Sequence, residues 1–179
     1  LIYQPEAGVV GAVYENSIIN APGFLNCSGL VFQTEGKVAV IHMSPETVKQ
    51  EDILVGDIDV LGHIRSVIKQ LIGGSENGKT KAGSVLSEEE IKTAQALIDS
   101  GALKSTMIVG DPIMTWLVDY MSRDGKAHNL PNMKVGSHFV GPEKSTVYAT
   151  PEKIFVEKSG VILEDGVNMP PPMFDFEEV

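Results

Sequence analysis

The chain has little of several residue types that mark particular classes of protein. It contains a single cysteine among 179 residues, which excludes an internal disulfide and fits a reducing compartment. Lys and Arg total 14 against 24 Asp and Glu, so the formal net charge is −10. Nucleic acids and anionic membranes are bound by clustered basic side chains, so we expect neither as a partner. A protein partner with a basic rim would suit this acidic composition.

Long hydrophobic runs are missing as well. No uninterrupted apolar stretch approaches the roughly 20 residues that a membrane-spanning helix needs. The chain also does not open with a basic segment followed by an apolar core, as a secretory signal would. We therefore expect a soluble, cytoplasmic protein. Because the first residue is Leu1 rather than Met, we expect a fragment or a processed product.

The length of the chain is about that of one domain, and a domain of this size buries roughly 70% of its unfolded surface. We expect one domain over residues 1–169, followed by an acidic, proline-rich tail, Pro170–Val179. Strand-like segments at both ends of the chain enclose segments with helical periodicity. This order predicts a layered α/β (α+β) domain, with a mixed, largely antiparallel sheet flanked by about three helices.

Three segments have the apolar spacing of amphipathic helices. The first starts at Asp57 and Asp59, which we expect to cap it. The second starts at Ser87, which forms a capping box with Glu90. The third follows Asp111-Pro112. The segments predicted to be strands are residues 7–13, 17–19, 28–33, 37–41, 105–109, 134–140, 145–149 and 153–156.

The most informative pattern surrounds the only cysteine, Cys27. The strands predicted over residues 28–33 and 37–41 are separated by a short Gly-containing gap, which is typical of a β-hairpin. If Gln33 pairs with Gly36, Cys27 lies directly opposite His42. Opposite residues share a face of the sheet, with Cβ atoms roughly 4.5–5.5 Å apart. At that distance the imidazole can take the thiol proton and leave a nucleophilic thiolate.

The register decides whether this pair forms. A loop one residue longer would set Cys27 opposite Met43 and turn the imidazole of His42 to the other face. A lone cysteine is also common as a small buried hydrophobic residue, and a lone histidine at a strand end is commonly just hydrogen-bonded. The pattern alone therefore leaves a structural role for both residues open.

The segment from Leu25 to Pro45 resembles the cysteine-to-histidine segment of the chemoreceptor glutamine deamidase family CheD. In that family a strand carries the cysteine, a Gly-containing turn follows, and the returning strand ends in a histidine shortly before a proline. Deamidase toxins of the cytotoxic necrotizing factor type share this layout on a related fold. The order of the later helices and strands also resembles CheD. The resemblance implies a CheD-like fold for the domain.

The same resemblance implies a cysteine-dependent amidohydrolase that deamidates a glutamine side chain in a partner protein. Cys27 would attack the carboxamide carbon after His42 accepts the thiol proton, ammonia would leave, and water would hydrolyse the thioester to glutamate. This mechanism requires no metal and no organic cofactor. Ser17, Asn20 and Asn26 are the nearby polar candidates for the group that orients the imidazole.

A second hypothesis treats the chain as a non-catalytic protein-binding domain that keeps a deamidase-like fold. CheD proteins usually have Gly-Ser before the cysteine, whereas this chain has Leu25-Asn26. The threonine expected upstream in the family is missing, with Ala21 near that place. Both departures favour the binding hypothesis.

A third hypothesis is nucleotide binding, because Gly73–Thr80 satisfies the Walker A pattern. A P-loop joins a buried strand to a helix, whereas here a helical pattern precedes the motif and another polar segment follows. We therefore expect residues 73–86 to form a flexible surface loop. His63, His128 and His138 show no metal-ligand spacing and are expected to be structural or surface groups.

Overall fold

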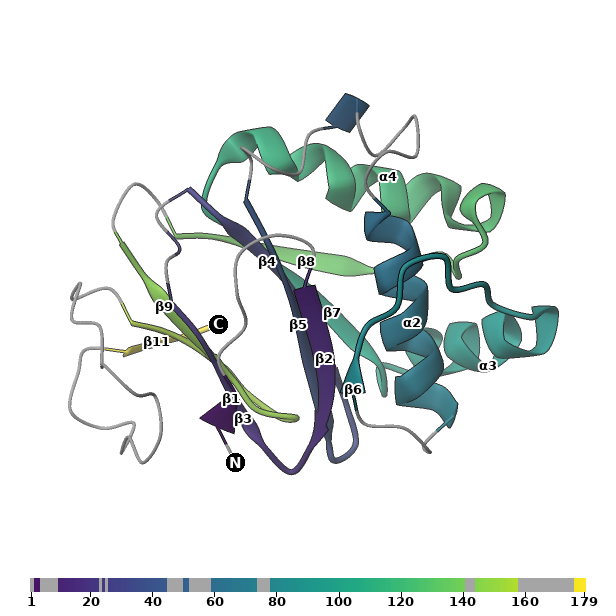
Figure 1. Cartoon of the computed structure of the whole chain (residues 1–179), viewed down its shortest axis with the longest axis horizontal. Coiled ribbons are helices and arrows are strands. Elements are labelled where there is room, and N and C mark those ends of the chain that lie inside the picture. The colour runs from purple at the N-terminus through teal and green to yellow at the C-terminus, as the bar shows by residue number, and fades with distance from the viewer. Residues whose placement is uncertain are drawn as a thin grey trace.

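A computed structural model of the chain describes residues 2–3, 10–22, 24, 26–44, 50–51, 59–73, 78–140, 144–157 and 176–179. A five-stranded sheet packs against one face of a six-stranded sheet, and helices pack against the other face (Figure 1). The predicted class, a layered α/β (α+β) fold with largely antiparallel strands and three flanking helices, is confirmed. The strands divide between two sheets, so the fold has one more β layer than the sequence pattern indicates.

The six-stranded sheet has the strand order β6-β2-β5-β4-β7-β8. All of its neighbouring strands are antiparallel except β7 and β8, which are parallel. The predicted strand over residues 105–109 is therefore interior, as β7. The bounds are Val10–Glu15 (β2), Ser28–Thr34 (β4), Lys37–Met43 (β5), Gly78–Lys79 (β6), Lys104–Val109 (β7) and Val135–Phe139 (β8).

The five-stranded sheet has the order β1-β3-β9-β10-β11. Its bounds are Ile2–Tyr3 (β1), Ile18–Ala21 (β3), Thr146–Ala149 (β9), Ile154–Glu157 (β10) and Phe176–Glu178 (β11). Strand β11 comes from the segment predicted to be an acidic, proline-rich tail, and it pairs antiparallel with β10. The end of the tail is therefore extended and belongs to the sheet, while the predicted boundary at residue 170 lies outside the described residues.

The three predicted helices are α2 (Val60–Gly73), α3 (Glu88–Asp99) and α4 (Trp116–Asp124), the last preceded by a 3-10 turn, η1 (Pro112–Thr115), and followed by another, η2 (Gly125–His128). The capping box of Ser87 and Glu90 is present at the start of α3. Asp59 caps α2 by accepting a 2.8 Å hydrogen bond from the Gly62 amide. Asp57, the other predicted cap, lies outside the described residues.

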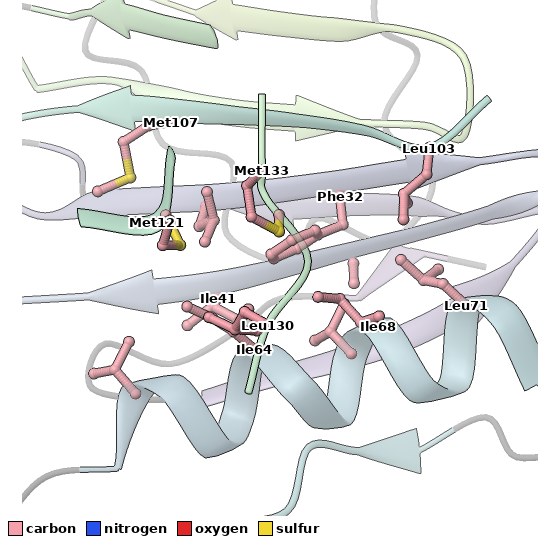
Figure 2. Close-up of a cluster of buried hydrophobic side chains, with 14 of the residues drawn as sticks. Phe32, Ile41, Ile64, Ile68, Leu71, Leu103, Met107, Met121, Leu130 and Met133 are labelled. Atoms are coloured by element: carbon pink, nitrogen blue, oxygen red, sulfur yellow. The ribbon is translucent and has the colours of Figure 1, made fainter. Parts of the chain in front are cut away.

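Two hydrophobic clusters hold the layers together, one on each face of the six-stranded sheet. Because side chains alternate along a strand, Phe32 and Ile41 face the helices while Val31 and Val40 face the five-stranded sheet. Figure 2 shows the helix side of this arrangement, where α2 packs under the sheet through its buried stripe. This stripe includes Val60, Ile64, Val67, Ile68 and Leu71, which recur at helical spacing.

Within the described part of the chain, no helix is both long enough and apolar enough to cross a membrane.

Candidate active site

The hairpin that carries the candidate site has a different register from the one predicted. Thr34 pairs with Lys37, so Glu35-Gly36 forms the two-residue loop, and Gly29 rather than Cys27 lies directly opposite His42. Gly36 has a φ of +71°, in the left-handed region that favours glycine. The loop must therefore include Gly36, which excludes the predicted pairing of Gln33 with Gly36.

In the corrected register, His42 still lies on the same face of the sheet as predicted, which is the face expected for Cys27. The partner of His42 moves by two positions along β4, and a shift of two residues preserves the face of a strand. Cys27 immediately precedes β4, and the alternation continued by one residue places it on the face of Gly29 and His42. Such diagonal neighbours lie roughly 7–8 Å apart, still within reach of aromatic and long side chains.

The imidazole of His42 is almost completely buried, with 2% of its surface exposed. It lies near the end of β5, between the two sheets, on the same face as Val40. Phe24, which is fully buried, stacks on it with ring centroids 4.6 Å apart and planes 1° from parallel. The described neighbours of this imidazole therefore include a stacked aromatic ring and the aliphatic side chains of the same face.

Cys27 is partly exposed to solvent. Its backbone is packed against Gly110, the residue that follows β7. A Cβ atom at Gly110 would lie 2.0 Å from the carbonyl oxygen of Cys27. The Gly110 amide donates a buried 3.2 Å hydrogen bond to the hydroxyl of Ser28. Two contacts from the end of β7 thus fix the backbone around the cysteine.

The three polar residues considered for orienting His42 lie in different places. The Ser17 hydroxyl donates to the Glu15 carbonyl (2.7 Å) and borders a pocket of about 270 Å³ beside Gly36, at the turn end of the hairpin. This end is six residues, roughly 20 Å of strand, from His42. Asn20 alternates with Ile19 and Ala21, which face the core between the sheets, so its side chain lies on the opposite face of β3, where it is also buried. Asn26 is exposed, immediately before Cys27.

The sequence pattern did not identify Phe24 as part of this site. One signal for it was available at Gly29, a glycine inside an apolar strand, which is typical of a close approach by another group. A Cβ atom at Gly29 would lie 2.8 Å from Cζ of Phe24. The glycine opposite His42 thus makes room for the ring that stacks on the imidazole.

His63 on α2 and His128 in η2 lie on the helix side, away from this site, and have structural contacts, whereas His138 on β8 lies in the same cross-strand row as Gly29 and His42. Nδ1 of His63 lies 2.5 Å from the hydroxyl of Thr80, and burial lowers the pKa of His63 although Asp59 opposes this shift. Nδ1 of His128 lies 3.0 Å from the Tyr120 hydroxyl. Among the described residues, no group of three His, Cys, Asp or Glu side chains is arranged to hold a metal ion.

The described part of the Walker-like segment connects a helix to a strand. Gly73 is the last residue of α2, and Gly78 and Lys79 form β6 at the edge of the six-stranded sheet. The prediction of a surface loop over residues 73–86 is therefore wrong for β6 and for Thr80, whose side chain is buried. A P-loop needs the opposite order, a strand leading into a helix.

No protein-family model matches the chain, and no curated protein matches it either. The resemblance to CheD therefore stays a prediction from the residues between Leu25 and Pro45.

Proposed function

We propose that the chain is a cysteine-dependent amidohydrolase that converts a glutamine side chain of a partner protein to glutamate. The observation that best supports this proposal is the hairpin register, which keeps His42 on the face expected for Cys27, while Cys27 is a partly exposed residue. A nucleophile needs a base within reach, and its sulfur must be open to the substrate.

In this proposal His42 accepts the proton of the Cys27 thiol, and the thiolate attacks the carboxamide carbon of the substrate. The C–N bond breaks as the imidazolium returns its proton to the departing ammonia. Water then hydrolyses the thioester, which releases glutamate and restores the thiol. The chemistry uses no redox step, and a free thiol of this kind suits a reducing compartment such as the cytoplasm.

The alternative is a protein-binding domain without catalysis, and one observation favours it. The imidazole of His42 is 2% exposed and stacked on Phe24, as expected for a histidine that serves packing. The two functions differ in what they require of Cys27, since only the enzyme needs a reactive thiol.

The proposal is tested by following glutamine conversion in mixtures of proteins. The purified chain is incubated with candidate partner proteins, and their masses are measured for the gain of about one dalton that replacement of NH₂ by OH produces. We expect the gain at specific glutamines with the wild-type chain and none with Cys27→Ala, which keeps a small apolar side chain at the position. The proposal is contradicted if Cys27→Ala converts the same glutamines as fast as the wild type.

A further inference from the structure

The geometry points to Phe24 as a positioning residue that fixes the plane of the His42 imidazole and so governs the reactivity of Cys27. This inference rests on the proposed function, and it adds an aromatic group to the polar candidates that the sequence suggested for orienting His42. Three independent contacts support it.

The first contact is the stacking itself. The two rings are parallel within 1° at a centroid distance of 4.6 Å. An imidazole on a strand can turn about its χ2 torsion, because such terminal torsions have broad minima. A fully buried aromatic ring against one face of the imidazole removes this freedom. The nitrogen atoms of His42 are then held in one plane relative to the strand.

The second contact is with Gly29, the cross-strand partner of His42. The edge of the Phe24 ring lies over this glycine, where a Cβ atom would lie 2.8 Å from Cζ and 3.0 Å from Cε1. Real Cβ atoms do not approach other atoms so closely, so the ring keeps its place only because residue 29 is glycine. Coverage of a glycine by a neighbouring aromatic ring is a known way to stabilise a sheet at that point.

The third contact anchors the backbone of Phe24. Its amide donates a 3.0 Å hydrogen bond to the carbonyl of Ser145, which immediately precedes β9 of the five-stranded sheet. Phe24 is also only three residues before Cys27 in the chain. One short segment, tied to the second sheet, therefore carries both the ring that orients the base and the nucleophile.

The positioning role is tested by replacing a buried phenylalanine with leucine on each of the two faces of the six-stranded sheet. Phe24→Leu removes the stacked ring but keeps an apolar side chain, and Phe32→Leu is the matched control. Phe32 is also fully buried in β4 but faces the helices, as Figure 2 shows. Two quantities are measured in each folded variant, the NMR signals of the His42 ring protons and the rate of Cys27 alkylation by iodoacetamide as a function of pH.

We expect Phe24→Leu to shift the His42 ring protons, because the ring current of Phe24 is lost, and to move the alkylation profile toward that of free cysteine. Alkylation at neutral pH should slow by about threefold to tenfold, since higher intrinsic nucleophilicity offsets part of the lost thiolate. Phe32→Leu should lower stability and leave both readouts unchanged.

A second variant separates positioning from packing. Gly29→Ala forces the Phe24 ring aside, and the double variant Gly29→Ala/Phe24→Leu relieves that clash. We expect the double variant to regain stability over Gly29→Ala but to keep the altered alkylation profile. If the profile recovers together with stability, Phe24 serves packing only and the inference is wrong.

The outcomes also distinguish this inference from the proposed function. Unchanged His42 ring protons in Phe24→Leu would overturn the positioning role while leaving the enzyme proposal in place. Shifted ring protons with an unchanged alkylation profile would show that Cys27 reactivity does not depend on the Phe24 ring, which also overturns the positioning role; the proposed function is contradicted instead if the alkylation profiles of the wild type and His42→Ala coincide.

Discussion

Helix α2 covers one face of the six-stranded sheet, and the five-stranded sheet covers the other. On the helix side, aliphatic side chains and methionines from several elements fill the space (Figure 2). On the sheet side, the apolar cluster ends at His42, where a stacked ring and a glycine replace aliphatic packing. The first arrangement is typical of a core that provides stability, whereas the second holds a titratable side chain in one orientation.

This difference between the two faces indicates which substitutions should change only the stability of the fold and which should also change the reactivity of Cys27. Side chains of α2 on the helix side lie on the face of the sheet opposite His42, so we expect their truncation to leave the thiol unchanged. Contacts on the sheet side, near the start of β4, involve the backbone of Cys27 itself. Substitutions on the helix side are therefore expected to lower stability without changing thiol reactivity, whereas substitutions on the sheet side are expected to change both.

The largest loss of stability alone is expected from Ile68→Ala on the helix side. Ile68 is fully buried in the cluster between α2 and the sheet. Removing such a side chain costs about 2–5 kcal/mol of unfolding free energy, because the cavity refills only in part. Urea unfolding measures this loss, and the alkylation rate of Cys27 in the folded variant should equal that of the wild type. A changed rate would show that the two faces are not independent.

Gly110→Ala should affect both properties on the sheet side. The added Cβ would lie 2.0 Å from the Cys27 carbonyl oxygen, and a backbone atom cannot rotate away. Overpacking of this kind costs about 1–3 kcal/mol or more. The alkylation rate of Cys27 should change as the backbone moves. Gly136→Ala on β8 is the control, since its nearest contact there would be 3.9 Å; equal effects at both glycines would contradict the account.

The smallest expected effect is on the pH dependence of stability, and it arises from His63 on α2, on the helix side of the sheet. Burial lowers the pKa of His63 in the folded chain below its ordinary value of 6.5. The unfolded chain therefore binds more protons as the pH falls below about 6.5, and the folded state loses stability there. His63→Gln removes this titration. We expect a shallower dependence of unfolding free energy on pH between 7 and 5 than in the wild type; an identical slope would contradict it.

Much of the fold could be predicted from local patterns. The capping box at Ser87 and the buried stripe of α2 depend on residues close in sequence, so spacing alone identifies them. The division of the strands into two sheets depends on contacts between distant segments, which no local pattern encodes. The hairpin register lies between these cases. The sequence shows a glycine in the turn region, but the predicted two-residue loop, Thr34-Glu35, lies one residue before the observed loop, Glu35-Gly36.

For the candidate site, the sequence predicts only which face of the sheet carries Cys27 and His42. Alternation along β4 and β5 places Cys27 and His42 on one side whenever the register error is an even number of residues. Gly29 indicates that some group approaches the strand closely, but the sequence does not identify that group as Phe24, which lies in a turn without periodicity. Polar candidates were favoured for the orienting role because hydrogen bonding is the commoner way to fix an imidazole.

The coupling of Cys27 to His42 is tested most directly by the rate of iodoacetamide alkylation against pH in the wild type, His42→Ala and Val40→Ala. Val40 is buried on the same strand and face, so its truncation controls for lost packing. We predict a wild-type midpoint below the roughly 8.5 of free cysteine, a higher midpoint in His42→Ala, and no change in Val40→Ala. Coincident profiles for the wild type and His42→Ala, or a thiol that resists the reagent in the folded chain, would contradict the account.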